Sequence, residues 1–547
     1  MTKMQDFGEV GLFLLAFFLL SNYSAVATET NFDVTKHLVH SYDTKDGCQA
    51  AVFDDLFTDE LLEQLRIAAF HFSIWNYHDK LGDVDKSNLL WRSEMQLEFF
   101  SKTYLWEAMS RAVSGVTHKT LYPFSVMGTI TRRFEPLVLE ETTSDDFMLM
   151  LFLSDINWKK NDYGNLSLYS RHRNGSVSSI LWTAHPQSGR VTFWNGTIPH
   201  MYHPPSIAQV FSGLILLVQA TDSKEKYEYE LEKSKKRLLE TENIFFKSEV
   251  FPTLPGIIPK YDLDKHLTRK FYDGEGRPVA VYDDLFTKEQ LDILYQFLTT
   301  VKGKLRFADT DVTLPEDGDN VNWIKMFTVD SFLPSNVWDV VSQVAQHISN
   351  NRTEWYPYDV SLNVIRNADH THIHTDCEKF EDEFTFLLYM NPDWDVNKYG
   401  ETVYFNEIND PITHLVGEST GNEQYEPIGA VTPKYGRVAI FRGIIPHSAR
   451  PPSADVHNAR YTFAVKVSKD KRTAMGKSLR EIMEEFDEGL TIKESAILSM
   501  LYHTDIDASI SDKLLYETLK DMQNKRVELM KTNLHDAKNF LLHNSHV

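Results

Sequence analysis

An internal repeat constrains this chain of 547 residues more than any other feature of its sequence. The stretch AAVFDDLFTDELLEQL at residues 50–65 recurs as VAVYDDLFTKEQLDIL at residues 279–294. Three further blocks recur in the same order: LYPFSV at Leu121 as WYPYDV at Trp355, DDFMLMLFLSDINWKKNDYGNLSLY at Asp145 as DEFTFLLYMNPDWDVNKYGETVYF at Asp382, and GRVTFWNGTIPHMYHPPS at Gly189 as GRVAIFRGIIPHSARPPS at Gly436. Four matched blocks in one order predict two copies of one domain.

Each copy has the pattern of a short strand, one or two helices, and then several strands broken by Gly, Pro and Asn turns. The runs FTFLLYM, RVAIFRG and RYTFAVKV are rich in β-branched and aromatic residues and have the length of strands. We therefore expect an α+β or mainly β fold in which each copy forms a closed or double-sheet β architecture with flanking helices.

The repeat and the changes in composition suggest where the domains begin and end. We place the first copy at residues 28–222 and the second at residues 263–469. The segment between them, 223–262, contains all but the first two residues of the charged run TDSKEKYEYELEKSKKRLLETEN, which reads as an exposed helix. It also includes FPTLPGIIP, which reads as a stiff linker. Residues 470–547 carry apolar side chains at helical spacing and either pack on the second domain or mediate dimerisation.

The first 27 residues have the pattern of a cleaved signal peptide. Lys3 precedes an apolar run over residues 10–20, and Ala25 and Ala27 form an A-x-A site. An uncleaved signal anchor is the alternative, but eleven apolar residues are fewer than the roughly 20 that a membrane span requires. We expect a protein with no membrane span after cleavage, in the lumen of the endoplasmic reticulum or secreted.

The sequons fit that compartment, while the net charge and the cysteine count bear on binding partners and on disulfides. The formal net charge of -22 argues against a nucleic-acid surface, which needs clustered Lys and Arg. N-glycosylation sequons occur at Asn165, Asn174, Asn195 and Asn351. The two cysteines, Cys48 and Cys377, are too few for a disulfide framework, and the sequence leaves open whether they pair.

The stretch HTHIHTD, residues 370–376, provides the candidate metal ligands. If it is a strand, His374 and Asp376 lie on the same face, because alternate residues of a strand do. A third ligand, His447, follows the predicted strand RVAIFRG and can reach the same point from a facing strand. Two imidazoles and one carboxylate leave open coordination positions, as in non-haem Fe(II) oxygenases.

A candidate anion anchor follows thirteen residues after His447. Arg460 opens the strand RYTFAVKV, and Thr462 lies two residues later on the same face. A buried guanidinium is costly unless it meets a carboxylate, and the C5 carboxylate of 2-oxoglutarate satisfies it with two hydrogen bonds. A surface ion pair is the alternative for Arg460.

These residues, with YMN at Tyr389 and YGETVYF at Tyr399, resemble the 2-oxoglutarate and Fe(II)-dependent dioxygenases of the prolyl 4-hydroxylase type. The resemblance implies a double-stranded β-helix, or jelly roll, with His374, Asp376 and His447 as iron ligands, Arg460 as the 2-oxoglutarate ligand, and a supporting hydroxyl from Tyr389. It also implies O₂ and 2-oxoglutarate as cosubstrates, ascorbate as reductant, and a peptidyl substrate, with proline the first choice; lysyl residues and small molecules remain open as substrates. His370 and His372 receive no role.

The first copy lacks most of this set. An ungapped extension of the block at Asp145 and Asp382 places Leu137 and Leu139 opposite His374 and Asp376. The block at Gly189 and Gly436 places His200 opposite His447 and, extended in the same way, Gly213 opposite Arg460. We expect this copy to be inactive, with a structural or substrate-binding role. Two alternatives for the whole protein are a non-catalytic binding or chaperone-like module and a partner-dependent subunit of a larger hydroxylase. The C-terminal helices provide one route to an oligomer.

Overall fold

The computed structural model describes most of both predicted copies. The described residues are 33–44, 47–72, 76–77, 91–95, 97–131, 139–140, 146–153, 158, 160–171, 176–206, 213–246, 251–257, 260–300, 306–307, 323–350, 353–367, 373–377, 381–408, 424–456, 459–484, 494–495, 497, 499 and 511–525. The predicted signal peptide, together with Leu137, His370 and His372, lies outside these residues.

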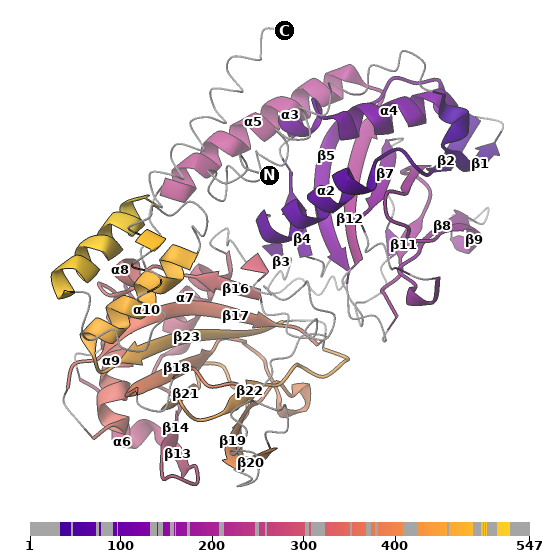
Figure 1. The fold of residues 1–547 in the computed structure, drawn as a ribbon. Coiled ribbons are helices and arrows are strands. Elements are labelled where there is room, and N and C mark those ends of the chain that lie inside the picture. The colour runs from indigo at the N-terminus through magenta and orange to yellow at the C-terminus, as the bar shows by residue number, and fades with distance from the viewer. Residues whose placement is uncertain are drawn as a thin grey trace, which may run out of the picture. The chain divides into compact units, whose positions relative to one another are not determined.

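The chain divides into two compact units, Met1–Phe246 with Val527–Val547, and Lys247–Arg526. The boundary between Phe246 and Lys247 falls inside the predicted connecting segment 223–262. Each unit combines helices with antiparallel sheets, an arrangement consistent with jelly-roll-like domains (Figure 1).

The first unit contains an eight-stranded sheet in the order β1-β2-β10-β7-β12-β5-β4-β3 and a four-stranded sheet in the order β6-β11-β8-β9. Its strands are β1 (Leu38–Thr44), β2 (Gly47–Phe53), β3 (Asn76–Tyr77), β4 (Trp91–Glu94), β5 (Tyr122–Thr131), β6 (Leu139–Glu140), β7 (Phe147–Phe152), β8 (Leu166–Arg171), β9 (Val177–Ala184), β10 (Val191–Asn195), β11 (His200–Tyr202) and β12 (Gly213–Thr221). Its helices are η2 (Val34–Lys36), α2 (Asp59–Phe72), α3 (Leu97–Phe100), α4 (Tyr104–Thr117), η3 (Lys160–Asp162) and α5 (Lys224–Phe246).

The second unit contains an eight-stranded sheet in the order β13-β14-β21-β18-β23-β17-β16-β15 and a three-stranded sheet in the order β20-β19-β22. Its strands are β13 (Leu267–Tyr272), β14 (Pro278–Tyr282), β15 (Arg306–Phe307), β16 (Trp323–Met326), β17 (Tyr356–Ile365), β18 (Glu383–Tyr389), β19 (Thr402–Ile408), β20 (Gln424–Val431), β21 (Val438–Arg442), β22 (His447–Ala449) and β23 (Arg460–Ser468). Its helices are α6 (Leu263–His266), α7 (Lys288–Thr300), α8 (Val329–Phe332), α9 (Asn336–Ile348), η4 (Val396–Lys398) and α10 (Lys471–Glu484).

The two large sheets have the same strand order, so positions in one can be matched to positions in the other. In the first sheet Phe152 pairs with Ile215, and in the second Tyr389 pairs with Thr462. Strand β12 therefore matches β23, and β7 matches β18. Strand β7 is a continuous apolar run, and β18 is apolar apart from Glu383 and Thr385. Both are buried along their whole length, as expected for strands covered on both faces.

The predicted linker is more deeply integrated than its composition suggested. Phe251 and Leu254 are buried, and the ring of Phe251 lies about 5 Å from those of Phe297, Phe327 and Phe332, all in the second unit. The composition indicated a linker but not this burial, which is favourable because it removes the apolar side chains of both residues from water.

The helices that flank the units are anchored by side chains. The charged helix α5 contacts β5 and β12, where the ring of Tyr227 stacks on that of Tyr122 at 5.5 Å between centroids. Helix α10 contacts β17 and β23, and Leu479 and Met483 share a buried cluster with Leu515 of the helical residues 512–525. The described helical residues 471–484 and 512–525 thus pack together on the second domain.

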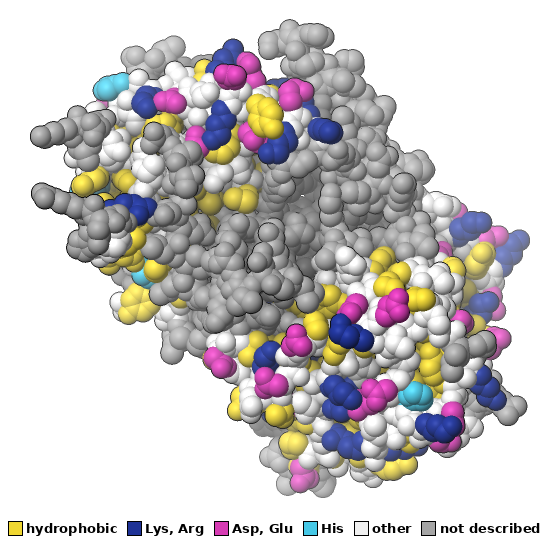
Figure 2. All heavy atoms as spheres, turned by 180° about the vertical axis from the view of Figure 1, so that it is seen from behind, with side chains coloured by type: hydrophobic (Ala, Val, Ile, Leu, Met, Phe, Trp, Pro, Cys, Tyr) yellow, Lys and Arg dark blue, Asp and Glu magenta, His cyan; other side chains and the backbone are white. Residues whose placement is uncertain are grey.

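The surface carries both signs of charge. Figure 2 shows Lys and Arg side chains interspersed with Asp and Glu over the face that it draws. Among the helices that the structure describes, none is long and apolar enough to cross a membrane.

Candidate active site

Three backbone hydrogen bonds bring the candidate metal ligands together. His374 and His447 exchange two of them, His374 N to His447 O at 3.0 Å and His447 N to His374 O at 2.9 Å. The N–H of Asp376 donates to the carbonyl of Gly443 at 2.8 Å, on the turn that joins β21 to β22. The short loop at His374 is therefore fixed against the start of β22. His374 and Asp376 on this loop face His447 on the strand.

The side chains of His374, Asp376 and His447 converge. The Nε2 atom of His447 lies 3.5 Å from one carboxylate oxygen of Asp376, and the Nε2 atom of His374 lies 3.9 Å from the other. All ligand atoms of the three residues lie within 4.8 Å of one another. Bonds of about 2.1 Å at right angles place ligand atoms roughly 3 Å apart, so small side-chain movements complete a metal site here.

The protonation states suit a metal site. Burial lowers the pKa of His447 to about 4, which keeps its imidazole neutral at physiological pH. Its Nδ1 lies 3.0 Å from the carbonyl oxygen of Ile445, so that Nδ1 donates and Nε2 is left to face Asp376. Burial acts to raise the pKa of Asp376, but Lys466 and the two histidines more than offset it and hold that pKa well below its usual range.

Arg460 lies in the interior at the other end of strand β23 from Lys466. Only 2% of its surface is exposed, its Nε donates to the carbonyl of Gly400 at 2.7 Å, and its Nη2 donates to Thr402 at 3.0 Å. Gly400 has a φ of +81°, and a Cβ there would lie 3.1 Å from the Arg460 side chain, so the backbone can approach the guanidinium closely only because the residue is glycine.

No carboxylate among the described residues forms an ion pair with this guanidinium, and burial lowers the pKa of Arg460. Nearby polar atoms also lack hydrogen-bond partners: the hydroxyls of Thr462 and Tyr404 are buried and unpaired. A buried cation beside unpaired hydroxyls is the environment that a small dicarboxylate would complete. The side chains present therefore fit 2-oxoglutarate as well as a divalent metal.

Tyr389 and Thr462 occupy neighbouring positions in this pocket, because they pair across β18 and β23. The ring of Tyr389 lies 5.2 Å from the guanidinium carbon of Arg460, and its hydroxyl is 2.7 Å from that of Thr402. The hydroxyl also donates to the carbonyl of Val431 at 3.3 Å. In this structure Tyr389 thus supports Thr402 and Arg460.

Sequence reasoning missed three residues of the site: Thr402, Thr385 and Lys466. Thr385 donates to one oxygen of Asp376 at 2.6 Å, and the Lys466 ammonium lies 3.2 Å from the other. Lys466 could have been found, because it follows Arg460 by six residues and an even spacing places both on one face of a strand. Thr402 carries no comparable signal, since its contact depends on how two sheets meet.

Six positions of this pocket are occupied by apolar residues or glycine in the first unit. The pairing of the strands matches Leu166 to Thr402, Ile215 to Thr462, Phe152 to Tyr389, Leu168 to Tyr404 and Met148 to Thr385. Gly213 matches Arg460, because both residues begin the equivalent strand. This unit therefore has no polar lining at these positions, and its interior is filled by a buried apolar cluster that includes Met148, Met150 and Trp194.

The ungapped match of Leu137 to His374 was wrong. His200 pairs with Glu140 on β6, as His447 pairs with His374, so Glu140 occupies the backbone position equivalent to His374. The segment before β7 is three residues shorter than its counterpart, and an ungapped match cannot detect that difference.

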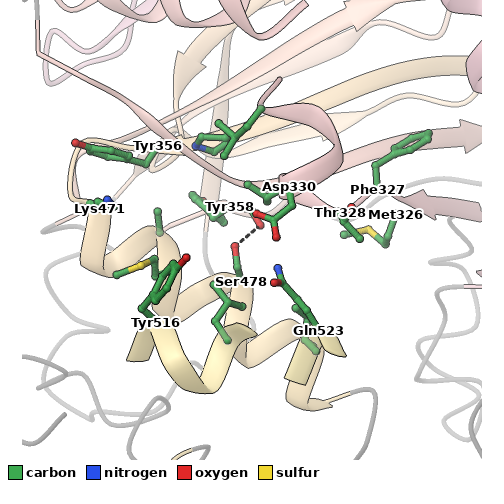
Figure 3. A pocket seen from close by; sticks show the side chains of 17 residues that line it. Met326, Phe327, Thr328, Asp330, Tyr356, Tyr358, Lys471, Ser478, Tyr516 and Gln523 are labelled. Carbon is green, nitrogen blue, oxygen red and sulfur yellow. Dashed lines mark hydrogen bonds between the residues drawn. The ribbon is translucent and has the colours of Figure 1, made fainter. Parts of the chain in front are cut away.

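A separate cavity of about 570 Å³ lies between β16, β17 and α8 on one side and α10 with residues 512–525 on the other. Figure 3 shows its walls, with Asp330, Tyr356 and Tyr516 around it and a hydrogen bond from Ser478 to the backbone of Tyr358. None of the predicted site residues lines it. Elsewhere, Cys48 and Cys377 are both free.

No protein-family model matches the chain, and no curated protein matches it. The solved structures that resemble it include 2-oxoglutarate and iron oxygenases, although their TM-scores are low. A family member from Burkholderia pseudomallei is 14% identical with a TM-score of 0.26, and the match covers 35% of this chain and 86% of that one. A Pseudomonas putida prolyl-4-hydroxylase is 14% identical with a TM-score of 0.24, covering 35% and 92%. A viral collagen prolyl hydroxylase from Paramecium Bursaria Chlorella virus-1 is 12% identical with a TM-score of 0.22, covering 32% and 97%. These matches do not establish an activity for this chain.

Proposed function

We propose that the second unit is an Fe(II)- and 2-oxoglutarate-dependent dioxygenase that hydroxylates an unactivated C–H bond of a peptidyl substrate. The balanced reaction joins O₂, 2-oxoglutarate and R–H to give R–OH, succinate and CO₂. One observation carries the proposal: two imidazoles and a carboxylate converge beside Tyr404, whose ring lies 6.3 Å from that of His447, and Tyr404 also neighbours Arg460, which is buried without a carboxylate partner among the described residues.

Each residue has a defined task in this proposal. His374, Asp376 and His447 would hold the iron, while Arg460 would hold the distal carboxylate of 2-oxoglutarate, with hydroxyl support from Thr462 and Tyr389. The bound iron and oxoacid supply the oxidising power that activates O₂. The chain positions them and shields the carboxylate of Asp376, the imidazole of His447 and the guanidinium of Arg460 from solvent. The side chain of His374 is 46% exposed, so the metal site would be open to solvent, and hence to O₂ and substrate, on that side.

The finer assignments extend the sequence resemblance. We infer a double-stranded β-helix in each unit, related by duplication, with a prolyl residue as the first substrate to test and ascorbate as the reductant. The apolar lining of the first unit favours a non-catalytic role for that unit, such as support or substrate binding. Residence in the secretory pathway stays a prediction from the sequence.

The decisive experiment measures succinate formation by the purified chain with Fe(II), 2-oxoglutarate and ascorbate, in the presence of collagen-like and Pro-rich peptides. Wild type should form succinate in a peptide-dependent manner, and His374→Ala should not. The matched control is His203→Ala in the first unit, which should retain full turnover because His203 contacts Ser167 and no ligand. Equal background rates for wild type and His374→Ala would refute the enzymatic proposal.

The alternative of a non-catalytic binding or chaperone-like module makes a different prediction in the same experiment. Wild type would then bind iron and a peptide, and the binding would depend on His374, but no peptide would raise succinate above the peptide-free rate.

A further inference from the structure

We propose that Lys466 stands in for the charge of the metal in the metal-free protein, bridging Asp376 and Asp359 so that the ligand carboxylate is already in place when a cation arrives. The inference rests on the proposed metal centre. It adds Lys466 as a positioning residue, which would lose its contact with Asp376 when the metal binds.

The position of Lys466 follows from strand register. Lys466 lies opposite Thr385 on β18 and opposite Asp359 on β17. Its ammonium is 3.2 Å from one oxygen of Asp376 and 3.2 Å from one oxygen of Asp359. One cation is therefore shared between two carboxylates from different elements.

Both carboxylates need such a cation when no metal is present. The side chains of Asp376 and Asp359 are only 5% and 10% exposed, and two buried anions that share one neighbour would otherwise repel each other. Thr385 fixes the orientation of the Asp376 carboxylate through its other oxygen but brings no charge. Lys466 therefore neutralises the Asp376 carboxylate, and Thr385 fixes its orientation.

The structure also provides a place for Lys466 once a metal has taken over Asp376. The second oxygen of Asp359 is buried and has no hydrogen-bond partner, so Asp359 can accept the ammonium fully. The Lys466 side chain is 28% exposed, which gives the ammonium room to move from one carboxylate toward the other. Metal binding would thus release Lys466 from Asp376 without leaving it unpaired.

The test compares Lys466→Gln with Lys466→Arg and with Lys469→Gln in the full chain. Glutamine is accommodated at this register, because Gln219 pairs with Met148 in the first unit as Lys466 pairs with Thr385 in the second. Lys469 pairs with Asp382 at 3.2 Å, outside the ligand set, and serves as the matched control. The readouts are Tm without metal, Tm with saturating Co(II), and the Kd for Co(II) by calorimetry, none of which requires turnover.

We expect Lys466→Gln to lower the metal-free Tm by about 2–4 °C or more, and the Co(II)-loaded Tm by less. Its Kd for Co(II) should be roughly tenfold tighter, because the metal no longer displaces a charge-assisted contact from Asp376. Lys466→Arg should resemble wild type, and Lys469→Gln should lower both Tm values equally with an unchanged Kd.

Equal loss of Tm with and without Co(II), or weaker Co(II) binding by Lys466→Gln, would overturn the inference and leave Lys466 a structural residue. Should that variant not fold, Asp359→Asn gives a second measurement. It removes the alternative partner of Lys466 and must weaken Co(II) binding, so an unchanged Kd overturns the inference as well. Failure of wild type to bind Co(II) would instead refute the metal centre itself.

Discussion

Replacing Arg460 with methionine separates the binding role of this residue from a role in stability. The substitution removes hydrogen bonds to Gly400 and Thr402 from a charged donor, each worth about 1.5–3 kcal/mol. It also removes a guanidinium that is buried without a carboxylate partner among the described residues, which relieves several kcal/mol of desolvation. The two terms are of similar size, so the free energy of unfolding of the ligand-free protein should change by less than about 2 kcal/mol.

Binding should respond very differently. If Arg460 holds the distal carboxylate of 2-oxoglutarate, its loss removes a bidentate charged contact worth about 3 kcal/mol, which corresponds to a Kd roughly 100-fold weaker. The assay is chemical denaturation, with and without 2-oxoglutarate, in the presence of Mn(II). We expect 2-oxoglutarate to stabilise wild type and to have no measurable effect on Arg460→Met at the same concentration.

Arg437 provides the matched control for this experiment. Unlike Arg460, it forms a bidentate ion pair, with both oxygens of Asp283 at 2.9 Å. Arg437→Met should cost roughly 2–3 kcal/mol of stability, since Asp283 loses its main partner and keeps only Lys434 at 3.4 Å. It should leave the response to 2-oxoglutarate intact. The reasoning fails if Arg460→Met loses as much stability as Arg437→Met while still responding to 2-oxoglutarate.

Three further predictions concern the surroundings of the site. Lys477→Gln should destabilise the protein at pH 7, because Lys477 lies 2.8 Å from the buried carboxylate of Glu383. Burial already raises the pKa of that carboxyl, and loss of Lys477 would raise it further, which costs stability at any pH above the unfolded-state pKa. Urea unfolding should therefore show the difference in unfolding free energy between variant and wild type shrinking as pH falls toward about 4.5. Phe251→Ala should lower the unfolding free energy by about 3–5 kcal/mol in the same assay, which a mere spacer residue would not do. Gly443→Ala should weaken Co(II) binding without preventing folding, because the new Cβ would lie 2.9 Å from the sulfur of Cys377 and must displace the ligand loop; an unchanged Kd would contradict this reading.

The sequence was most informative where the chemistry depends on local spacing. The H-x-D spacing places His374 and Asp376 side by side on a short loop, and the structure brings His447 to them from a neighbouring strand. Arg460 and Thr462 are both buried at the start of one strand, as their alternation predicts. Arg460 and Thr462 need only the two-residue period of a strand. His374 and Asp376 lie on a loop instead of the expected strand, and they converge because an isolated bridge holds His374 against His447.

What the sequence could not provide is register between strands. Lys466 contacts Asp376 because β23 pairs with β18 in one alignment, and a shift by one residue would turn Lys466 to the opposite face. The same limit explains the wrong match of Leu137, because strand pairing, not sequence distance, places Glu140 opposite His200. The burial of Phe251 was not predicted for another reason. Neighbouring Pro and Gly residues indicate the backbone conformation of a segment, but they do not indicate which side chains its aromatic ring will contact.

The filled interior of the first unit makes any past loss of chemistry there difficult to reverse. Ligands can be regained by a few substitutions, but a cosubstrate also needs volume, and Trp194 and Met150 now occupy the interior. Exchanging a buried tryptophan for a small residue costs about 3–5 kcal/mol, a large part of the 5–15 kcal/mol that keeps a typical domain folded. If the first unit arose by the proposed duplication, selection for a folded protein would therefore oppose each substitution that leads from this packed interior toward an open pocket.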